Sequence, residues 1–485
     1  MEKQKSVISN LIWRFAERTG AQGVSFIVSL VLARLLEPSA YGTIALVTVF
    51  TTILQVFVDS GMGNALIQKK DADDIDFSTV FYFNVFICLI LYVGMFIAAP
   101  FIAKFYNDDS LTAVIRVLCL TIVISGVKNV QQAYVSRKMQ FKRFFFATLG
   151  GTIISAILGI LMAYRGCGVW ALVVQQIFNA LAATVILWIT VKWRPKLVFS
   201  FERLKGLFSF GWKLLTSSLI DTVYNNIRQL IIGKLYSAED LSYYNRGKQF
   251  PNFIVTNVNT SIDSVLLPAM SSEQDDIKRV KNMTRRSIKT STYIMAPLMM
   301  GLAFMATNVV KLILTDKWLA CVPFLQIFCI TYMFYPINTA NLNAIKAMGR
   351  SDLFLRLEII KKIVGVIVLV TTMWFGVLTM AYSLLLTSII GQIINSWPNK
   401  KLLGYGYMEQ IKDIIPGILI AVCMGICIYP LKFLSLPIIC IVILQVILGA
   451  TIYMGLSAFF KLEAFEYILN IIKSFFNKFF KNKNI

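Results

Sequence analysis

The stretch Ser78–Pro100 reads STVFYFNVFICLILYVGMFIAAP and contains no charged residue in 23 positions. An apolar helix of about 20 residues is long enough to cross the hydrocarbon core of a bilayer. The stretch Pro437–Ser457 (PIICIVILQVILGATIYMGLS) has the same character. Surface helices of soluble proteins carry a continuous polar face, and these two segments have none. They therefore predict an integral membrane protein.

The rest of the chain follows the same pattern. Of its 485 residues, 57% are hydrophobic and 15% are charged, whereas soluble domains carry about 25% charged residues. The longest polar connection, 271–290, is about twenty residues long and leaves no room for a separate soluble domain. We expect an all-α integral membrane protein with about fourteen transmembrane helices. The predicted spans are Val7–Ala33, Tyr41–Val58, Ser78–Ala103, Leu111–Val135, Phe144–Tyr164, Val169–Val191, Gly206–Ile232, Phe250–Met270, Ser291–Val310, Leu319–Ala344, Leu353–Phe375, Val377–Trp397, Ile414–Pro430 and Leu436–Phe460.

The net charge of +22 would suggest a nucleic-acid partner for a soluble protein. Here the basic residues lie mostly between the spans, with about 30 Lys and Arg in the loops on one side and about 9 on the other. The positive-inside rule places the richer side, which holds both termini, in the cytoplasm. We therefore expect a multi-pass protein of the bacterial cytoplasmic membrane with no nucleic-acid partner. The basic segments 137–143 and 473–483 are expected to lie near anionic lipid.

The composition offers little for catalysis or metal binding. The eight cysteines are scattered singly, mostly within predicted spans, where they are expected to act as small hydrophobic residues. The chain has no histidine, which removes the commonest general base and metal ligand. We expect neither a metal site nor a cofactor. Arg14, Glu17 and Arg18 interrupt the first apolar stretch, which favours a retained helix over a cleaved signal peptide.

An internal repeat organises the chain. Leu30–Leu36 (LVLARLL) resembles Leu230–Tyr236 (LIIGKLY), 200 residues later. A later match, at an offset of 209, pairs Asn129, Gln132, Arg137 and Met139 with Asn338, Asn341, Lys346 and Met348. Six predicted spans separate the repeat starts, so the two halves have the same orientation and a transport site is expected at their interface. We predict a six-helix bundle at 1–200, a second at 201–400, and two further helices with a basic tail at 401–485.

The order of the helices and several short motifs resemble a known family. The motifs are Ala33–Gly42 (ARLLEPSAYG), Tyr243–Arg246 (YYNR), Leu266–Ser271 (LLPAMS) and Ala347–Asp352 (AMGRSD). They resemble the polysaccharide transporters of the multidrug/oligosaccharidyl-lipid/polysaccharide exporter superfamily, and within it the Wzx-like flippases of O-antigen or teichuronic-acid type. The resemblance implies two six-helix bundles related by a pseudo-twofold axis, alternating access, and an undecaprenyl-pyrophosphate-linked oligosaccharide as substrate. It also implies a monomer whose partners are membrane lipids, a polysaccharide polymerase and glycosyltransferases.

Ionisable residues within the predicted spans give the candidate site. Each costs about 2.5–3.5 kcal/mol at a helix centre, so it is expected to face a wet cavity or a partner. Lys213 occupies the repeat position of Arg14, and Asp221, Asn225 and Arg228 share one helix face. Cations suit a pyrophosphate, and amides suit sugar hydroxyls. The predicted substrate-binding residues are Arg14, Glu17, Arg18, Lys128, Lys213, Asp221, Asn225, Arg228, Lys248, Asn252, Asn259 and Asp263.

Other interpretations of these residues stay open. Arg14 and Arg18 could extend to the headgroups instead of facing a cavity. Asp221 and Arg228 could tie helices together, and Lys248 could simply end a loop. Two carboxylates, Asp221 and Asp263, are also candidates for proton or sodium coupling, as is Glu17.

Three other functions share parts of this pattern. A lipid II flippase moves a similar pyrophosphate-linked glycan, and a cation-coupled multidrug exporter has the same fold but would favour acidic residues inside the bundle. A membrane glycosyltransferase or polymerase would need a larger extracytoplasmic loop with clustered carboxylates or arginines. The sequence therefore predicts a flippase and not an enzyme. Because no Gly-x-x-x-x-Gly-Lys-Ser/Thr loop occurs, we expect transport to be driven by an ion gradient, the membrane potential or consumption of the glycan.

Overall fold

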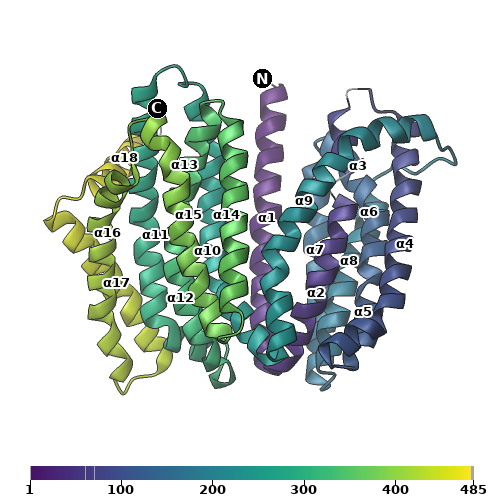
Figure 1. Ribbon diagram of the computed structural model, residues 1–485, viewed down its shortest axis with the longest axis horizontal. Coiled ribbons are helices and arrows are strands. Elements are labelled where there is room, and N and C mark those ends of the chain that lie inside the picture. The colour runs from purple at the N-terminus through teal and green to yellow at the C-terminus, as the bar shows by residue number, and fades with distance from the viewer. Residues whose placement is uncertain (1, 60–61, 70, 482–485) are drawn as a thin grey trace. The chain divides into compact units, whose positions relative to one another are not determined.

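The computed structural model describes residues 2–59, 62–69 and 71–481, with only the helical backbone for residues 2–12, 14–19, 64, 210, 471, 472 and 475–481. Every regular element in these described residues is a helix (Figure 1). The chain divides into two compact units, Met1–Ser242 and Tyr243–Ile485. Each unit is described on its own below.

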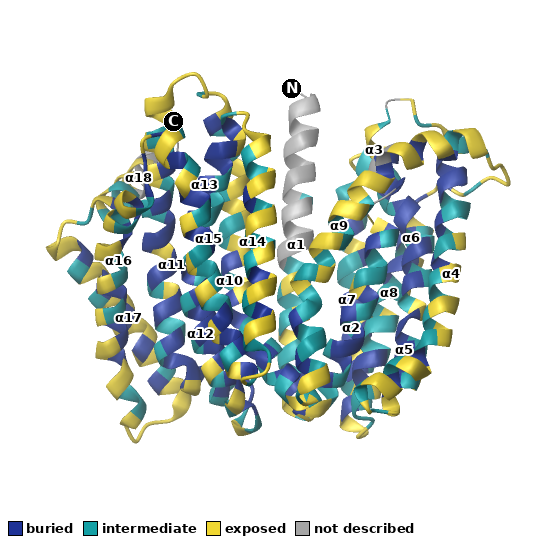
Figure 2. Ribbon diagram, viewed as in Figure 1, coloured by how far each residue is buried: buried dark blue, intermediate teal, exposed yellow. Residues whose placement is uncertain are grey.

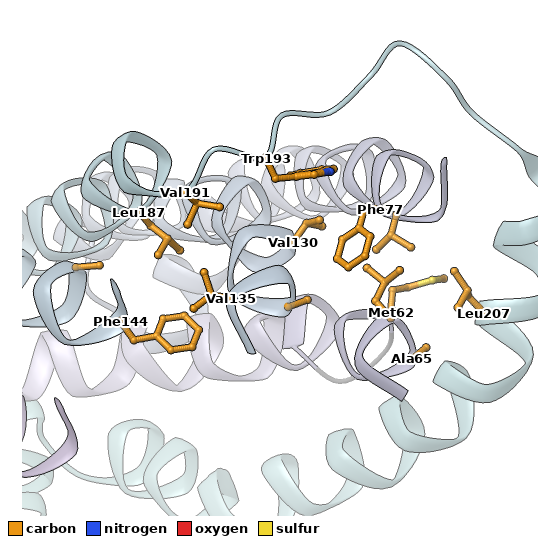
Figure 3. Packing of buried hydrophobic residues seen from close by; sticks show 14 of the residues in the cluster. Met62, Ala65, Phe77, Val130, Val135, Phe144, Leu187, Val191, Trp193 and Leu207 are labelled. Carbon is orange, nitrogen blue, oxygen red and sulfur yellow. The ribbon is translucent and has the colours of Figure 1, made fainter. Parts of the chain in front are cut away.

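The first unit contains nine helices in the described residues, and most of them run side by side (Figure 1). One buried cluster lies at the end of the unit that holds α3, where Trp193 contacts Phe77, with ring centroids 5.7 Å apart (Figure 3). Trp193 also stacks on Tyr134, with ring centroids 6.2 Å apart. The chain between α8 and α9 is therefore packed onto the bundle. The helices are α1 (Glu2–Leu35), α2 (Pro38–Asp59), α3 (Met62–Gln68), α4 (Asp74–Tyr106), α5 (Ser110–Leu118), α6 (Leu120–Arg137), α7 (Phe141–Tyr164), α8 (Val169–Thr190) and α9 (Phe201–Leu235).

The second unit is built around α11, which carries many buried residues and contacts α12, α13, α16, α17 and α18. α10 begins in the last residues of the first unit and lies mostly in the second. The helices are α10 (Ala238–Ser271), α11 (Ile277–Ile313), α12 (Val322–Met333), α13 (Tyr335–Ala347), α14 (Ser351–Thr372), α15 (Val377–Leu402), α16 (Tyr407–Ile428), α17 (Ile438–Phe459) and α18 (Glu463–Lys481), with 3-10 helices at Asp316–Cys321 and Tyr429–Phe433.

Ten helices or helix groups in the described part of the chain are long and apolar enough to cross a membrane. Large apolar side chains are exposed along them, as on α4, where Phe101 is 71% exposed, and on α17, where Ile447 is 61% exposed (Figure 2). Such a surface suits lipid and not water. The spans are Pro38–Asp59, Asp74–Tyr106, Ser110–Arg137, Phe141–Tyr164, Val169–Thr190, Ile277–Ile313, Asp316–Ala347, Val377–Leu402, Tyr407–Phe433 and Ile438–Phe459.

The other four predicted spans fall on α1, α9, α10 and α14, which are 34, 35, 34 and 22 residues long. Their length is sufficient for a membrane crossing, but charged and amide residues make them more polar than the ten. The all-α membrane fold is confirmed, and the count of fourteen is approximate. Three of these four more polar helices, α1, α9 and α10, carry eleven of the twelve predicted site residues.

The helix boundaries repeat along the chain. α1 ends at Leu35 and α2 begins at Pro38, while α9 ends at Leu235 and α10 begins at Ala238, an offset of 200. α6 and α13 each end in a turn with a left-handed residue, Met139 (φ 53°) and Gly349 (φ 71°). These turns are 210 residues apart, one more than the offset of 209 at which the residue types match. The predicted limits at 200 and 400 stay a prediction.

The structure refines four predicted segments. The predicted polar connection 271–290 is helical from Ile277, because the Asp276 carboxylate caps α11 by accepting from the Arg279 N–H at 3.0 Å. The predicted spans Leu111–Val135 and Leu319–Ala344 lie within the candidate crossings Ser110–Arg137 and Asp316–Ala347. Each consists of two helices, which meet at Cys119 in the first and at Phe334, just before Pro336, in the second. The basic tail forms helix α18 up to Lys481, in which apolar residues recur at helical spacing.

Candidate functional site

The middle of α9 carries four of the predicted site residues. Lys213, Asp221 and Asn225 are exposed on this helix, whereas Arg228 is buried, with an exposed fraction of 8%. Arg228 is therefore enclosed by protein, whereas Lys213, Asp221 and Asn225 lie at the exposed surface of the helix. Sequence spacing alone had placed Arg228 on the same face as Asp221.

α9 is held at both ends within the first unit. Near its start, Arg203 donates to the Asp73 carboxylate at 2.6 Å and lies 3.4 Å from Asp76, which is fully buried. Near its end, the Tyr106 hydroxyl donates to the Leu230 carbonyl at 3.4 Å. The N–H of Asp76 and the guanidinium of Arg203 hold the pKa of the Asp73 carboxyl below its usual value. The exposed middle of α9 is thus a polar segment between two fixed ends.

A second polar stripe lies on α10, mostly in the second unit. Asn252 and Asp263 are exposed, and Lys248 and Asn259 are half-buried. The Asp263 carboxylate accepts from Asn343 of α13 at 2.8 Å, and Asn343 itself is 1% exposed. A buried amide therefore fixes the orientation of an exposed carboxylate.

Asn259 differs from the rest of the α10 stripe. Its Oδ1 atom is enclosed by protein and has no hydrogen-bond partner among the described residues. Buried amide oxygens are normally satisfied, so this atom is free to accept from water or from a ligand hydroxyl.

Lys128 lies apart from both stripes. It is half-buried on α6, and its charge interacts with that of Asp59 at the end of α2. Asp59 also accepts from Gln55 at 3.0 Å and from Asn129 at 3.3 Å. Lys128 is therefore part of a polar cluster inside the first unit. A nearby carboxylate is the kind of partner that an ionisable residue at membrane depth requires.

The first helix carries the remaining predicted residues. Arg14, Glu17 and Arg18 lie on α1 where only the backbone is described, so their predicted side-chain roles fall outside the described residues. The helix itself is continuous through all three positions and packs against α7.

Sequence reasoning missed several ionisable residues in the second unit. On α14, Lys361 donates to Glu358 at 2.6 Å, and both side chains are mostly buried. On α11, Arg285 pairs with Asp413 of α16. The rule that located the α9 and α10 residues, an ionisable side chain within a predicted span, also applies to α14 and had not been used there. Within the described residues, no group of three or more His, Cys, Asp or Glu side chains could hold a metal ion.

Comparison with known proteins adds sequence relatives. Residues 31–323 match the model of a family described as polysaccharide biosynthesis protein. The chain is 24% identical to the teichuronic acid biosynthesis protein TuaB of Bacillus subtilis over 379 residues, which cover 78% of each protein. It is 22% identical to the lipopolysaccharide biosynthesis protein WzxC of Escherichia coli over 442 residues, or 88% of this chain and 89% of that one.

Solved structures show the same fold. The lipid II flippase MurJ in an inward closed conformation superimposes with a TM-score of 0.75, covering 93% of this chain and 98% of that one at 15% identity. An inward-facing multidrug resistance transporter of the MATE family gives a TM-score of 0.60, covering 79% of this chain and 95% of that one at 16% identity. These likenesses concern the fold alone, because sequence identity is low.

Proposed function

Because this chain belongs to the polysaccharide biosynthesis protein family, we propose that it is a flippase for a lipid-linked oligosaccharide. The substrate is an oligosaccharide on undecaprenyl pyrophosphate, and the protein moves it from the cytoplasmic to the outer leaflet by alternating access. The product supplies surface polysaccharide synthesis. Both termini lie in the cytoplasm, in line with the excess of Lys and Arg on that side.

One observation supports this proposal most directly. α9 and α10 keep exposed charged and amide side chains over several turns, whereas ten helices or helix groups in the described residues are apolar enough to cross a membrane. Such residues are costly at membrane depth and mark a path for a polar substrate. Lys213 offers a cation for phosphate oxygens, and Asn225 and Asn252 offer amides that both donate to and accept from sugar hydroxyls.

The relatives and fold neighbours also bear on the class of protein. Those whose names state an activity are transport proteins or flippases, which favours a transporter over a glycosyltransferase or polymerase. Membrane lipids are a partner because apolar side chains cover the surface of the spans. We include in the proposal that the protein acts as a monomer and receives its substrate from glycosyltransferases before a polymerase extends it.

Reconstitution tests the function directly. The purified chain is placed in vesicles whose two leaflets both contain a fluorescent undecaprenyl-pyrophosphate oligosaccharide, and an impermeant quencher is added outside. Protein-free vesicles retain the inner half of the signal, and we expect protein-containing vesicles to lose most of it. Retention of that half with every oligosaccharide tested would contradict the proposal. Equal transport of lipid II would assign the protein to cell-wall synthesis instead, and efflux of cationic drugs would assign it to multidrug export.

A further inference from the structure

A groove in the second unit lies outside the polar stripes. It runs between α10 and α11 and is closed on one side by α18, with a cavity volume of about 720 Å³. Its α10 wall extends from Asn257 to Ala269, which at 1.5 Å per residue is about 18 Å long. Its α11 wall extends from Met283 to Ile294. Ala269 and Met283 are the lining residues nearest the α10–α11 turn.

The walls of the groove are apolar in effect. Val258, Ile262, Val265 and Leu266 line it from α10. Three of the polar side chains along it bond to their own helix. On α10, Asn257 donates to the Phe253 carbonyl at 2.7 Å, and Ser261 donates to the Asn257 carbonyl at 2.9 Å. On the other wall Ser291 likewise donates to the Ser287 carbonyl. Side chains satisfied in this way present mainly carbon to a ligand.

One cation stands at the end of the groove nearest the turn. The Arg286 guanidinium lies over the Tyr467 ring of α18, 4.7 Å from its centroid, and is exposed. Among the described residues no carboxylate lies within ion-pair distance of it. Its neighbour Arg285 differs, since two of its nitrogens donate to Asp413 at 2.7 and 2.8 Å. Arg286 therefore keeps its guanidinium edge available, and the aromatic ring fixes its plane.

We propose that this groove binds an anionic phospholipid, with one acyl chain along α10 and α11 and the phosphate on Arg286. The length of the walls suits a single acyl chain and is short for a polyprenyl chain. A single cation suits a phosphodiester, whereas a pyrophosphate calls for several. Arg286 precedes the predicted membrane entry at Ser291 by about 7 Å of helix, which is headgroup depth. α18, whose Tyr467 lines the groove, also carries Lys473, and basic interfacial helices attract anionic lipid.

Native mass spectrometry and lipid exchange on the purified full-length protein test this site. Phosphatidylglycerol and phosphatidylcholine with the same acyl chains are titrated in detergent. We expect tighter retention of phosphatidylglycerol, and R286A should weaken it about tenfold to a hundredfold, as loss of a charge-assisted contact does. Y467F should bind like the parent because it keeps the ring face, whereas Y467A should bind more weakly.

Matched variants separate the groove from general surface effects. S261W fills the groove and should abolish preferential binding. S264W changes the same residue type three positions later, at an exposed site on α10 that does not line the groove, and should leave binding unchanged. R279Q removes a nearby cation that already pairs with Glu273 and serves as the charge control. Equal phosphatidylglycerol binding by R286A and the parent would overturn the proposal. So would displacement of the phospholipid by undecaprenyl phosphate at equal concentration, which would give the groove to the substrate. Neither result depends on transport.

Discussion

Arg285 of α11 forms a two-point ion pair with Asp413 of α16, with Nε and Nη2 at 2.7 and 2.8 Å from the two carboxylate oxygens. The Asp413 carboxylate also accepts from the Tyr405 hydroxyl at 2.8 Å. Lys289 lies 3.6 Å from Asp413 and also bonds to Glu463 at the start of α18. These ion pairs thus join three helices, α11, α16 and α18, that are distant in sequence.

Asp413→Asn should destabilise the second unit. The Asp413 side chain is only 11% exposed, and the neutral amide loses the ion pairs with Arg285 and Lys289. Because the Arg285 side chain is 47% exposed and stays solvated, we expect a cost of about 1 kcal/mol. Thermal unfolding in detergent, followed by intrinsic fluorescence, should show a lower midpoint. The control is Asp352→Asn, which breaks the exposed Arg350–Asp352 pair and should leave the midpoint unchanged, because exposed pairs contribute little. Equal midpoints for D413N and the parent would show that the network is not structural.

The cations of α9 should act on transport. We predict that Lys213→Ala weakens substrate interaction by about 1.5–3 kcal/mol, or one to two decades in affinity, if its ammonium contacts phosphate. The same holds for Arg14 and Arg18 of α1 in the predicted cationic site. Initial flipping rates at several substrate concentrations measure the effect. Lys205→Ala, on the same helix but outside the site, is the control.

Arg228 gives a different expectation from Lys213. Because it is buried, Arg228→Ala should lower the unfolding midpoint as well as transport. An R228A protein with normal stability and normal transport would remove this residue from both roles.

Asp263 is the carboxylate best placed for ion coupling on α10. Asp263→Asn keeps its size and its contact with Asn343 but removes the charge. If this carboxylate carries the coupling proton or sodium ion, transport by D263N should no longer respond to an imposed pH or sodium gradient. Asp240→Asn, at the start of the same helix, should respond as the parent does. A full gradient response in D263N would place coupling elsewhere, with Asp221 the next candidate.

Membrane topology can be checked by labelling single cysteines in a background without the exposed Cys423, Cys427 and Cys440. We expect D109C and E239C to react with an impermeant thiol reagent in intact cells. Q274C, in the α10–α11 turn, should react only after the membrane is opened. Labelling of Q274C in intact cells would invert the orientation inferred from the loop charges.

The contact between Asp73 and Arg203 should weaken in acid. The pKa of Asp73 is lowered in the folded chain, so its contribution is present above the unfolded pKa of about 3.9 and is lost as pH falls through the lower folded value. A double-mutant cycle of D73N and R203Q, measured by thermal unfolding, should give a coupling that is constant near pH 6 and shrinks below pH 4. A coupling that grows in acid would contradict this assignment.

The sequence determined the fold class and most of the transmembrane helices by itself. Uncharged runs such as Ser78–Pro100 can satisfy their backbone hydrogen bonds in lipid only as helices, so hydropathy is sufficient to locate them. The repeat was visible for a similar reason, since the break between Leu35 and Pro38 recurs between Leu235 and Ala238. The presence of ionisable residues on α9 and α10 could also be read directly, because each is costly in a span.

Only the tertiary structure decided which of these charges are paired. Arg285 and Arg286 are adjacent in sequence and identical in type, yet one lies in a carboxylate pair and the other on an aromatic ring. Asp263 and Asn343 meet across 80 residues, as Arg285 and Asp413 do across 128. Consecutive side chains of a helix point about 100° apart. Arg285 and Arg286 therefore meet different neighbouring helices, whose packing no local sequence pattern encodes. The environment of each charge, and with it the division between structural and ligand-binding roles, therefore depends on the folded bundle.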